Sequence, residues 1–361
     1  MRIVVASDHL PPHRSGHAVA AAWWIRALAD AGHELTVVGD APPLPDVAVR
    51  WRRLPVLPGF TPGHPLAAFR PPGRALAGLM DDPPDVLHLH GYGPACRTAW
   101  AALPGVPTVV TLHAFPDGSG APVAPVVVPV MRKLLTTMLD RARRITVPSD
   151  AARRMLEDLL GPEAGRDRVD VLPVGVDPVF APAARPSSAT DSSGSTERRT
   201  FLYVGRRSRA KGFDLFARLA HAHPEHDWHA IGDGPGGPDT PYRITPHAGP
   251  REVAAALYEA DALLAPGPHE TQGLVALEAL HCGTAVAVPR GSAQAEVVTD
   301  GRQGRTYRPR DDEAAWEALR TAAELTRANA VRPPPGFERD ALLDRMVGTF
   351  LRAMEDPDPA S

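Results

Sequence analysis

Two carboxylates flank a glycine in the stretch PHETQGLVALEALHCG. Glu270 precedes Gly273, and Glu278 follows it inside an apolar run that predicts a helix. The free N–H groups at the start of that helix, from Gly273, Leu274 and Val275, would attract an anionic phosphate. Ionised carboxylates accept hydrogen bonds from hydroxyl groups. The pattern therefore favours a phosphate site bordered by hydroxyl-rich groups over two unrelated glutamates at a helix surface.

Two cations lie five residues apart in the stretch GRRSRAKG, directly after the apolar run Phe201–Val204. Arg206 and Lys211 would follow the carboxyl end of a strand, where α/β sheets bind ligands, and together they can straddle a diphosphate. The alternative is a solvated basic turn. The chain holds only two lysines among its 39 basic residues, so a lysine here is an unusual choice and favours a specific role. The following stretch IGDGP predicts a tight glycine turn after another strand.

The strands and helices that position these residues are indicated by short apolar runs that alternate with helical patterns. This alternation predicts an α/β protein with parallel sheets covered on both faces. A helix is expected at 18–31 and another at 339–355, where apolar residues recur at helical spacing. Strands are expected at 2–7, 35–39, 86–90, 108–112, 144–147, 168–172, 201–205, 228–232, 262–265 and 285–288.

The 361 residues fit two domains. The stretch 181–199, APAARPSSATDSSGSTERR, lacks apolar periodicity and predicts a flexible linker. We therefore expect an N-terminal Rossmann-like domain at 1–180 and a C-terminal Rossmann-like domain at 200–338.

Composition excludes several other classes of protein. The net charge of −3 argues against nucleic acid as a partner. The two cysteines form neither a disulfide framework nor a zinc motif. Asp356-Pro357-Asp358 is discounted as a metal site because it lies in a tail expected to be frayed. No apolar stretch approaches a membrane span, and the start of the chain looks like a buried strand, so we expect a cytoplasmic protein that makes at most transient membrane contact.

The motifs occur in the order seen in retaining glycosyltransferases of family 4. Gly-Arg-x4-Lys-Gly, Ile-Gly-Asp-Gly-Pro, the Glu-x7-Glu pair and AEVVTDGRQG make up the C-terminal half of this resemblance. LADAGHELTVV, DVLHLH, VVTLHAF and VLPVGVD make up the N-terminal half, so the resemblance covers nearly the whole chain. It implies the GT-B fold, two Rossmann-like domains with an interdomain cleft, and a C-terminal helix at 339–355 that packs back on the first domain.

The resemblance also implies roles for the matching positions. Arg206 and Lys211 would hold the diphosphate of a nucleoside diphosphate sugar, while Glu270 would bind the donor sugar and Glu278 the ribose. Backbone N–H groups of Gly273 and Leu274 would contact the phosphates, Gly16 would let the first loop approach them, and His113 would lie beside the transferred sugar. The sequence departs from the family pattern at Val174, where asparagine is usual, and beside Gly16, where Ser15 or His17 replaces a second glycine.

The resemblance implies a bacterial, hexosyltransferase-like enzyme that needs no metal and no cofactor besides its sugar nucleotide co-substrate. Fixed cations and a helix N-terminus would stabilise the leaving diphosphate, and the sugar would be transferred with retention of configuration. The acceptor, a small molecule, lipid or glycan, would bind the N-terminal domain, for which His90, Tyr92 and Lys133 are candidates. The alternatives are a sugar-nucleotide epimerase on the same fold and a catalytically silent sugar-nucleotide-binding protein.

Overall fold

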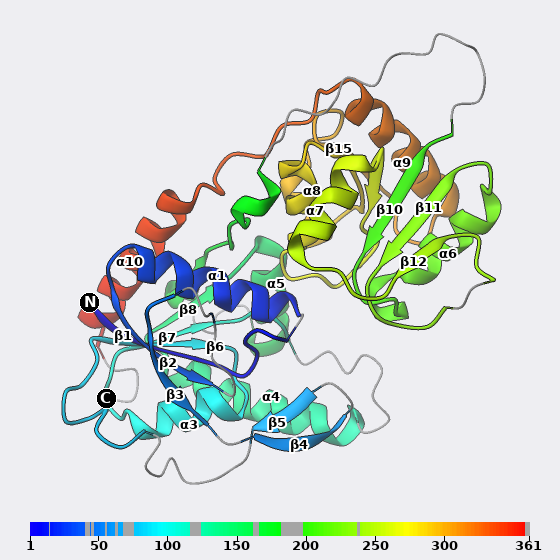
Figure 1. Cartoon of the computed structure of the whole chain (residues 1–361). Helices are drawn as coiled ribbons and strands as arrows, with labels where there is room; N and C mark the ends of the chain where they lie inside the picture. Colours follow the sequence, from blue (N-terminus) through cyan, green and yellow to red (C-terminus); the bar gives the residue numbers. More distant parts are fainter. Residues whose placement is uncertain are drawn as a thin grey trace. The chain divides into compact units, whose positions relative to one another are not determined.

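The chain forms two compact units in the computed structural model (Figure 1). One unit contains residues 1–175 and 337–361, and the other contains residues 176–336. Within these bounds the structure describes residues 1–13, 15–39, 44, 47–54, 56–61, 64–67, 76–115, 124–161, 166–181, 198–236 and 239–357. The predicted linker at 181–199 lies outside the described residues except for Ala181, Arg198 and Arg199.

The first unit is built on a parallel seven-stranded sheet in the order β3-β2-β1-β6-β7-β8-β9. Its central strands are almost completely buried, as expected for a parallel sheet covered on both faces. The strands are β1 (Arg2–Ser7), β2 (Glu34–Gly39), β3 (Arg50–Arg53), β6 (Val86–His90), β7 (Thr108–Thr111), β8 (Arg144–Val147) and β9 (Val169–Val171). A separate antiparallel pair consists of β4 (Val56–Thr61) and β5 (His64–Ala67).

Two helices of the first unit, α1 and α5, begin at serine side chains that cap them. The Oγ atoms of Ser15 and Ser149 accept hydrogen bonds from backbone N–H groups in the first turns of α1 and α5. The predicted helix at 18–31 therefore starts earlier, directly after Ser15. The helices are α1 (Gly16–Asp30), α3 (Pro94–Ala102), α4 (Ala124–Arg141), α5 (Asp150–Leu160) and α10 (Arg339–Glu355), and a 3-10 turn, η1, covers Arg166–Arg168.

The C-terminal helix α10 belongs to the first unit. Phe350 is fully buried there, and its ring meets that of His88 on β6 with centroids 5.2 Å apart. Beyond the helix, Asp356 accepts two hydrogen bonds from the Arg144 guanidinium, at 2.6 and 3.2 Å. The expectation of a frayed tail was therefore wrong at Asp356, because this bidentate ion pair fixes its position. Asp358 lies outside the described residues.

The second unit is built on a parallel six-stranded sheet in the order β12-β11-β10-β13-β14-β15. The strands are β10 (Thr200–Val204), β11 (Asp227–Ile231), β12 (Arg243–Thr245), β13 (Ala262–Leu264), β14 (Val286–Pro289) and β15 (Gly304–Tyr307). The helices are α6 (Phe213–Ala222), α7 (Pro250–Glu259), α8 (Leu274–His281) and α9 (Asp312–Arg327). Short 3-10 turns are η2 (Pro178–Phe180), η3 (Arg209–Lys211) and η4 (Ala293–Val297).

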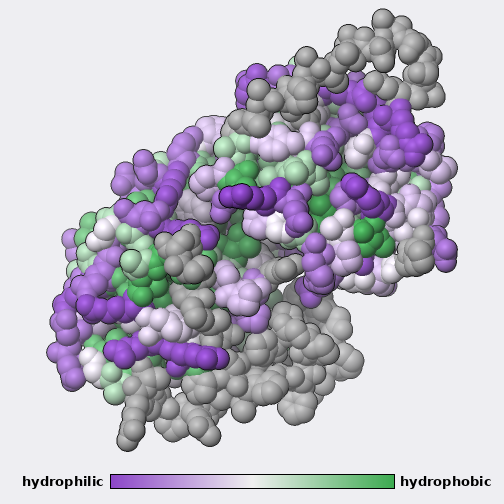
Figure 2. Space-filling model, viewed as in Figure 1, coloured by the Kyte–Doolittle hydropathy of each residue, from purple (hydrophilic) through white to green (hydrophobic). Residues whose placement is uncertain are grey.

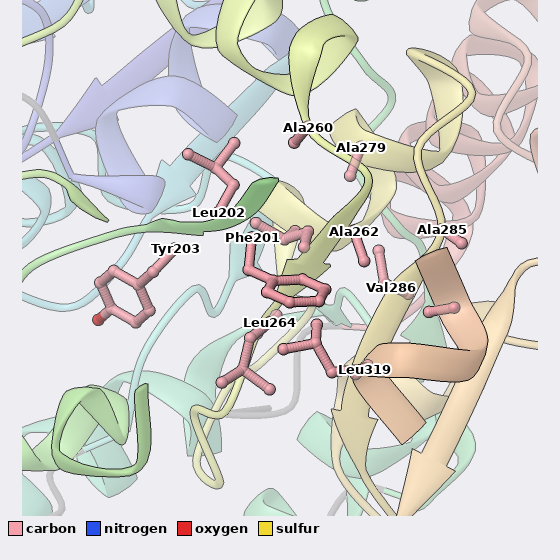
Figure 3. Packing of buried hydrophobic residues seen from close by; sticks show 14 of the residues in the cluster. Phe201, Leu202, Tyr203, Ala260, Ala262, Leu264, Ala279, Ala285, Val286 and Leu319 are labelled. Carbon is pink, nitrogen blue, oxygen red and sulfur yellow. The ribbon is translucent and has the colours of Figure 1, made fainter. Parts of the chain in front are cut away.

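The core of the second unit is packed around its central strands (Figure 3). Phe201 on β10 is fully buried, and its ring lies 4.9 Å from that of Trp228. Phe201 and Tyr203 extend to the same side of β10 in Figure 3, where Leu264 and Leu319 lie near Phe201, whereas Leu202 between them points to the opposite side. Alternate residues of β10 thus fill both faces of the sheet, which holds the loops at its carboxyl end in fixed positions.

The strand order creates one topological switch point in each sheet. Successive connections run in opposite directions from β1 and β6 in the first unit, and from β10 and β13 in the second. Open α/β sheets bind ligands outside the carboxyl ends of the strands at such a point. The predicted α/β class with two Rossmann-like parallel sheets is confirmed, and each sheet offers one position for a site.

Hydrophilic residues are interspersed with smaller hydrophobic groups on the displayed face of both units (Figure 2). Among the described residues, no helix combines the length and the apolar character that crossing a bilayer requires.

Candidate functional site

Two loops meet at the switch point of the second unit. The loop after β10 carries Arg206 and Lys211, and the loop after β13 carries Glu270. Gly212 has a φ of +69°, and a Cβ there would lie 2.6 Å from the carbonyl oxygen of Pro266. Only glycine permits both this backbone conformation and this close approach. The glycine that ends the Gly-Arg-x4-Lys-Gly motif therefore brings the two loops together.

Lys211 and Glu270 form an ion pair across these loops. Lys211 Nζ donates to Glu270 Oε1 over 2.6 Å, and the two side chains are 36% and 21% exposed. Because both ends remain accessible to solvent, a ligand with more negative charge can compete for the ammonium group. The structure thus brings together two residues that the family resemblance assigns to different parts of one ligand, Lys211 to the diphosphate and Glu270 to the donor sugar.

Arg206 and Arg207 are adjacent in sequence but differ in environment. Arg206 is exposed, whereas Arg207 is only 3% exposed. The Arg207 guanidinium donates to three carbonyl oxygens of the IGDGP turn, those of Pro235 at 2.9 Å, Gly234 at 2.5 Å and Gly232. Arg206 is therefore the arginine that a diphosphate can reach, while Arg207 fixes the neighbouring turn.

The IGDGP turn needs its glycines for close backbone contacts. A Cβ on Gly232 would lie 2.1 Å from the carbonyl oxygen of Gly205, and one on Gly234 would lie 2.4 Å from that of Arg207. The turn thus packs directly on the loop that carries Arg206. Sequence reasoning missed Arg207, although a second arginine beside Arg206 and a glycine-rich turn was the available signal.

Helix α8 begins at this site without a side-chain cap. Its N-cap residue is Gly273, with a φ of +77°, and a Cβ there would lie 2.1 Å from the side chain of Gln294. Gln294 is buried, and with its amide nitrogen facing Ala265 and Gly267 it donates to their carbonyl oxygens over 3.0 and 3.3 Å. Gln294, which sequence reasoning also missed, therefore supports the loop from behind.

Glu278 lies on α8, one turn beyond Leu274 and Val275 at its start. Burial, together with the nearby carboxylate of Asp177, raises the pKa of Glu278 to about 7. Asp177 itself caps η2, accepting a hydrogen bond from Val179 N–H over 3.0 Å. The ionised form of a carboxyl that is desolvated in this way is stabilised when hydroxyl groups donate hydrogen bonds to it.

The first unit gathers six histidines near its switch point, and we call them the histidine cluster. They come from the loop after β1 and the start of α1, from β6 and from the end of β7: His9, His13, His17, His88, His90 and His113. Gly16 begins α1 and is exposed, with no atom within 4 Å of an added Cβ. The open space around Gly16 leaves this helix start accessible.

His90 and His113 form the centre of the histidine cluster. His90 Nδ1 lies 2.8 Å from His113 Nε2, and the two ring planes differ by 3°. His17 Nε2 lies 2.9 Å from the carbonyl oxygen of His90, and its ring centroid lies 4.8 Å from that of His113. His90 is completely buried, so its ring is not exposed to an acceptor in this structure.

Burial keeps the central histidines neutral. It lowers the pKa of His17 and of His88 to about 3, and, with contributions from the neighbouring rings, it lowers the pKa of His90 and of His113 well below the usual range. Each neutral imidazole has one donor and one acceptor nitrogen, so its hydrogen-bond partners determine which nitrogen carries the proton.

Asp8 lies in the loop after β1 and binds the start of α3. Its Oδ1 accepts a hydrogen bond from Ala95 N–H over 2.6 Å, and burial raises its pKa to about 6. A Cβ on Gly93 would lie 2.4 Å from the Asp8 carboxyl group. Asp8 therefore serves as the cap that the N-cap glycine of α3 cannot provide.

The remaining acceptor candidates come from different elements of the first unit. Tyr92 follows β6 and packs against the core of the first unit, while Lys133 is exposed on α4. Among the described residues, no group of three or more histidine, cysteine or acidic side chains is arranged to hold a metal ion.

Two family models match successive parts of the chain. Residues 14–180 match Glycosyltransferase Family 4, and residues 198–324 match Glycosyl transferases group 1. The solved structures similar in fold include sucrose-phosphate synthase from Thermosynechococcus elongatus, with a TM-score of 0.72 at 18% identity, covering 98% of this chain and 99% of that chain. Anabaena HepE in complex with UDP and glucose has a TM-score of 0.71 at 14% identity, covering 97% and 99%.

Curated relatives with similar sequences are also transferases. The chain is 29% identical to the D-inositol 3-phosphate glycosyltransferase of Mycolicibacterium smegmatis over 300 residues, which are 75% of this chain and 68% of the relative. The enzyme of the same name from Kineococcus radiotolerans is 30% identical over 61% of this chain and 59% of its own length. Glycogen synthase of Mycobacterium tuberculosis is 28% identical over 92% and 89%.

The fold and the family matches together define a glycosyltransferase with the GT-B fold. The chain belongs to glycosyltransferase family 4, with a second unit of the group 1 type.

Proposed function

We propose that this enzyme transfers a sugar from a nucleoside diphosphate sugar to a hydroxyl acceptor, with retention of configuration and without a metal ion. The observation that carries the proposal is the Lys211–Glu270 pair, 2.6 Å between Nζ and Oε1, at the switch point of the second unit. Anabaena HepE, similar in fold, was solved with UDP and glucose, which supports a nucleotide-sugar donor.

The second unit supplies the donor site in this proposal. Arg206 and Lys211 hold the diphosphate, and its oxygens also accept hydrogen bonds from the N–H groups of Gly273, Leu274 and Val275 at the start of α8. When the diphosphate takes over the Lys211 ammonium group, the Glu270 carboxylate becomes available to the hydroxyl groups of the donor sugar.

Two further residues complete the donor contacts. Glu278 accepts hydrogen bonds from the ribose hydroxyl groups, and Gly16 lets the first loop approach the phosphates. The raised pKa of Glu278, about 7, supports this assignment because ribose hydroxyl groups would replace the water that its carboxylate lacks.

The chemical step follows from the charges. The bond between the anomeric carbon and the phosphate oxygen breaks, and its electron pair goes to the leaving diphosphate. The acceptor hydroxyl oxygen forms its bond to the anomeric carbon on the same face, and its proton passes to the departing phosphate oxygen. Arg206, Lys211 and the α8 N-terminus stabilise the negative charge that develops on the diphosphate. Neutral His113 contacts the sugar without opposing the positive charge that develops there.

The acceptor binds the first unit in this proposal, with Tyr92 and Lys133 as candidate contacts. Lys133 is exposed, so an acceptor that carries an anionic group would be favoured there. The M. tuberculosis mannosyltransferase that is 51% identical over 70 residues is named for a phosphatidylinositol dimannoside substrate, which supports testing anionic lipid acceptors.

Thermal-shift screening against UDP-, GDP-, ADP- and dTDP-sugars, in buffer containing EDTA, tests the donor assignment. We expect one nucleotide series to stabilise the protein, and mass spectrometry to detect hydrolysis or transfer of the sugar in the presence of EDTA. Proton NMR of the product should show the anomeric configuration of the donor. Binding without turnover would indicate a silent binding protein, and an absolute requirement for Mg²⁺ or an inverted product would contradict the mechanism.

A further inference from the structure

His90 and His113 meet nitrogen to nitrogen rather than face to face. The nearest nitrogens, His90 Nδ1 and His113 Nε2, are 2.8 Å apart, the centroids are 5.1 Å apart, and the ring planes differ by only 3°. Two imidazoles joined in one plane by a hydrogen bond have this geometry, because the lone pair and the N–H bond both lie in the ring plane. One proton is therefore shared between these two nitrogens.

The position of that proton follows from the other nitrogen of His90. His90 Nε2 is buried and has no hydrogen-bond partner among the described residues. If Nε2 carried the proton, a buried N–H donor would lack an acceptor, whereas an unprotonated Nε2 leaves only an unused lone pair. Orphaned buried N–H groups are the rarer case in proteins. The proton of His90 is thus on Nδ1, and it is donated to His113 Nε2.

The surrounding structure holds His90 in this orientation. The carbonyl oxygen of His90 accepts a hydrogen bond from His17 Nε2 over 2.9 Å, and its ring packs against that of His88, with centroids 4.2 Å apart. His90 is fully buried, so it has little freedom to reorient.

We propose that His90 is a positioning residue that holds His113 as the neutral tautomer with its proton on Nδ1. His113 then presents an N–H donor toward its remaining side, and it stays uncharged beside the transferred sugar. This inference rests on the proposed function, which places His113 at that sugar. It reassigns His90 from the acceptor contacts expected from the sequence to a role exerted through His113.

Substitutions at position 90 separate this role from packing. Asn keeps a polar nitrogen near the position of Nδ1, Gln keeps one near Nε2, and Phe keeps the ring volume with neither. We expect His90→Phe and His90→Gln to lower kcat roughly 10- to 100-fold while KM for the donor changes less than about threefold. We expect His90→Asn to retain kcat within about threefold of wild type.

His88→Phe is the matched control, because it keeps an aromatic ring against His90 and removes only the hydrogen bond to Thr111, which does not involve His113. It should lower stability without lowering kcat by more than about threefold. Nitrogen-15 NMR of the histidine rings gives a readout independent of turnover: wild-type His113 should show a protonated Nδ1, and His90→Phe should shift this tautomer equilibrium.

Each outcome decides the inference. An unchanged kcat in His90→Phe, an equal loss in His88→Phe, or a protonated Nε2 on wild-type His113 would overturn it. His113→Ala distinguishes the two levels of the argument. If His113→Ala keeps full kcat, the proposed role of His113 is wrong; if it loses kcat while His90→Phe does not, only the positioning role of His90 is wrong.

Discussion

At the scale of single residues, the ion pair between Lys211 and Glu270 explains how one site can serve two parts of a donor. In the unliganded protein each group neutralises the other across two loops. A diphosphate carries more negative charge than one carboxylate, so it can displace Glu270 from the ammonium group. Binding of the phosphates would then also free the Glu270 carboxylate to accept hydrogen bonds from the hydroxyl groups of the sugar.

Replacing Lys211 tests this exchange. Lys211→Met keeps the length of the side chain but removes the charge, and we expect it to weaken binding of the nucleoside diphosphate roughly 10- to 100-fold, the effect of losing a charge-assisted contact. Arg209→Met is the matched control, because Arg209 is exposed on the same 3-10 turn. Calorimetry measures both. Equal losses in the two variants would mean that the turn provides only a diffuse positive field.

The raised pKa of Glu278 predicts a pH-dependent cost to folding. Because the pKa rises from 4.5 to about 7 in the folded protein, the folded state binds this proton more tightly than the unfolded state. Binding of this proton therefore stabilises the folded state fully below pH 4.5, and this contribution to stability is lost as the pH rises through 7. Glu278→Gln removes the carboxylate, so it should stabilise the protein by about 1–3 kcal/mol at pH 8 but little at pH 4.5.

Thermal denaturation at both pH values measures this difference, with exposed Glu259→Gln as the control. A Glu278→Gln gain that is the same at pH 4.5 and pH 8 would contradict the raised pKa.

At the scale of elements, glycines fix how the loops of the proposed donor site pack on one another. Gly212→Ala must accommodate both a φ of +69° and a Cβ 2.6 Å from the Pro266 carbonyl oxygen. Gly283→Ala has a similar φ of +74° but no atom within 4 Å, so it bears only the backbone cost of about 1 kcal/mol. Gly212→Ala should therefore lose more stability and also weaken nucleotide binding. Urea unfolding and calorimetry compare the two variants, and equal losses would show that the loop contact is unimportant.

The histidine cluster predicts acid sensitivity of the first unit. The pKa values of His17, His88, His90 and His113 lie below 6.5 in the folded state, so the unfolded state takes up more protons as the pH falls. Stability is therefore present above pH 6.5 and is lost as the pH falls below it, by up to about 1.4 kcal/mol per pH unit for each histidine. Asp8 offsets part of this loss, because its raised pKa of about 6 favours the folded state on acidification.

Urea unfolding between pH 7 and pH 5 measures the slope, and His88→Gln should reduce it by about one proton, whereas exposed His221→Gln should not. If His88→Gln leaves the dependence of the unfolding free energy on pH unchanged, burial does not lower the pKa of His88.

Most sheet elements could be predicted from the sequence because each is a buried apolar run that ends in a turn residue. The strands at 2–7, 86–90 and 144–147 were confirmed with these bounds. The edge strands β3 (RWRR) and β12 (RIT) escaped prediction because exposed edge positions carry arginines and no apolar pattern.

At the scale of the whole molecule, local sequence indicates the proposed donor residues better than the histidines of the first unit. The donor motifs are contiguous: one stretch contains Arg206 and Lys211, and another contains Glu270 and Glu278. The histidine cluster is assembled from the loop after β1 and the start of α1, from β6 and from the end of β7, which only the sheet order β1-β6-β7 brings side by side. Nothing in the spacing of His17, His90 and His113 indicates that contact, so the pairing of His90 with His113 could not be predicted.

The central claim is that Glu278 binds the nucleotide and Glu270 the transferred sugar, and one comparison tests it most directly. Calorimetry with the nucleoside diphosphate and steady-state kinetics are measured for both glutamine variants. Ribose contacts change little during reaction, so Glu278→Gln should mainly raise the Kd for the nucleoside diphosphate. Glu270→Gln should lower kcat on the order of 10²-fold with little change in that Kd, because sugar contacts can tighten in the transition state. The reverse pattern, or no change in either variant, would contradict the account.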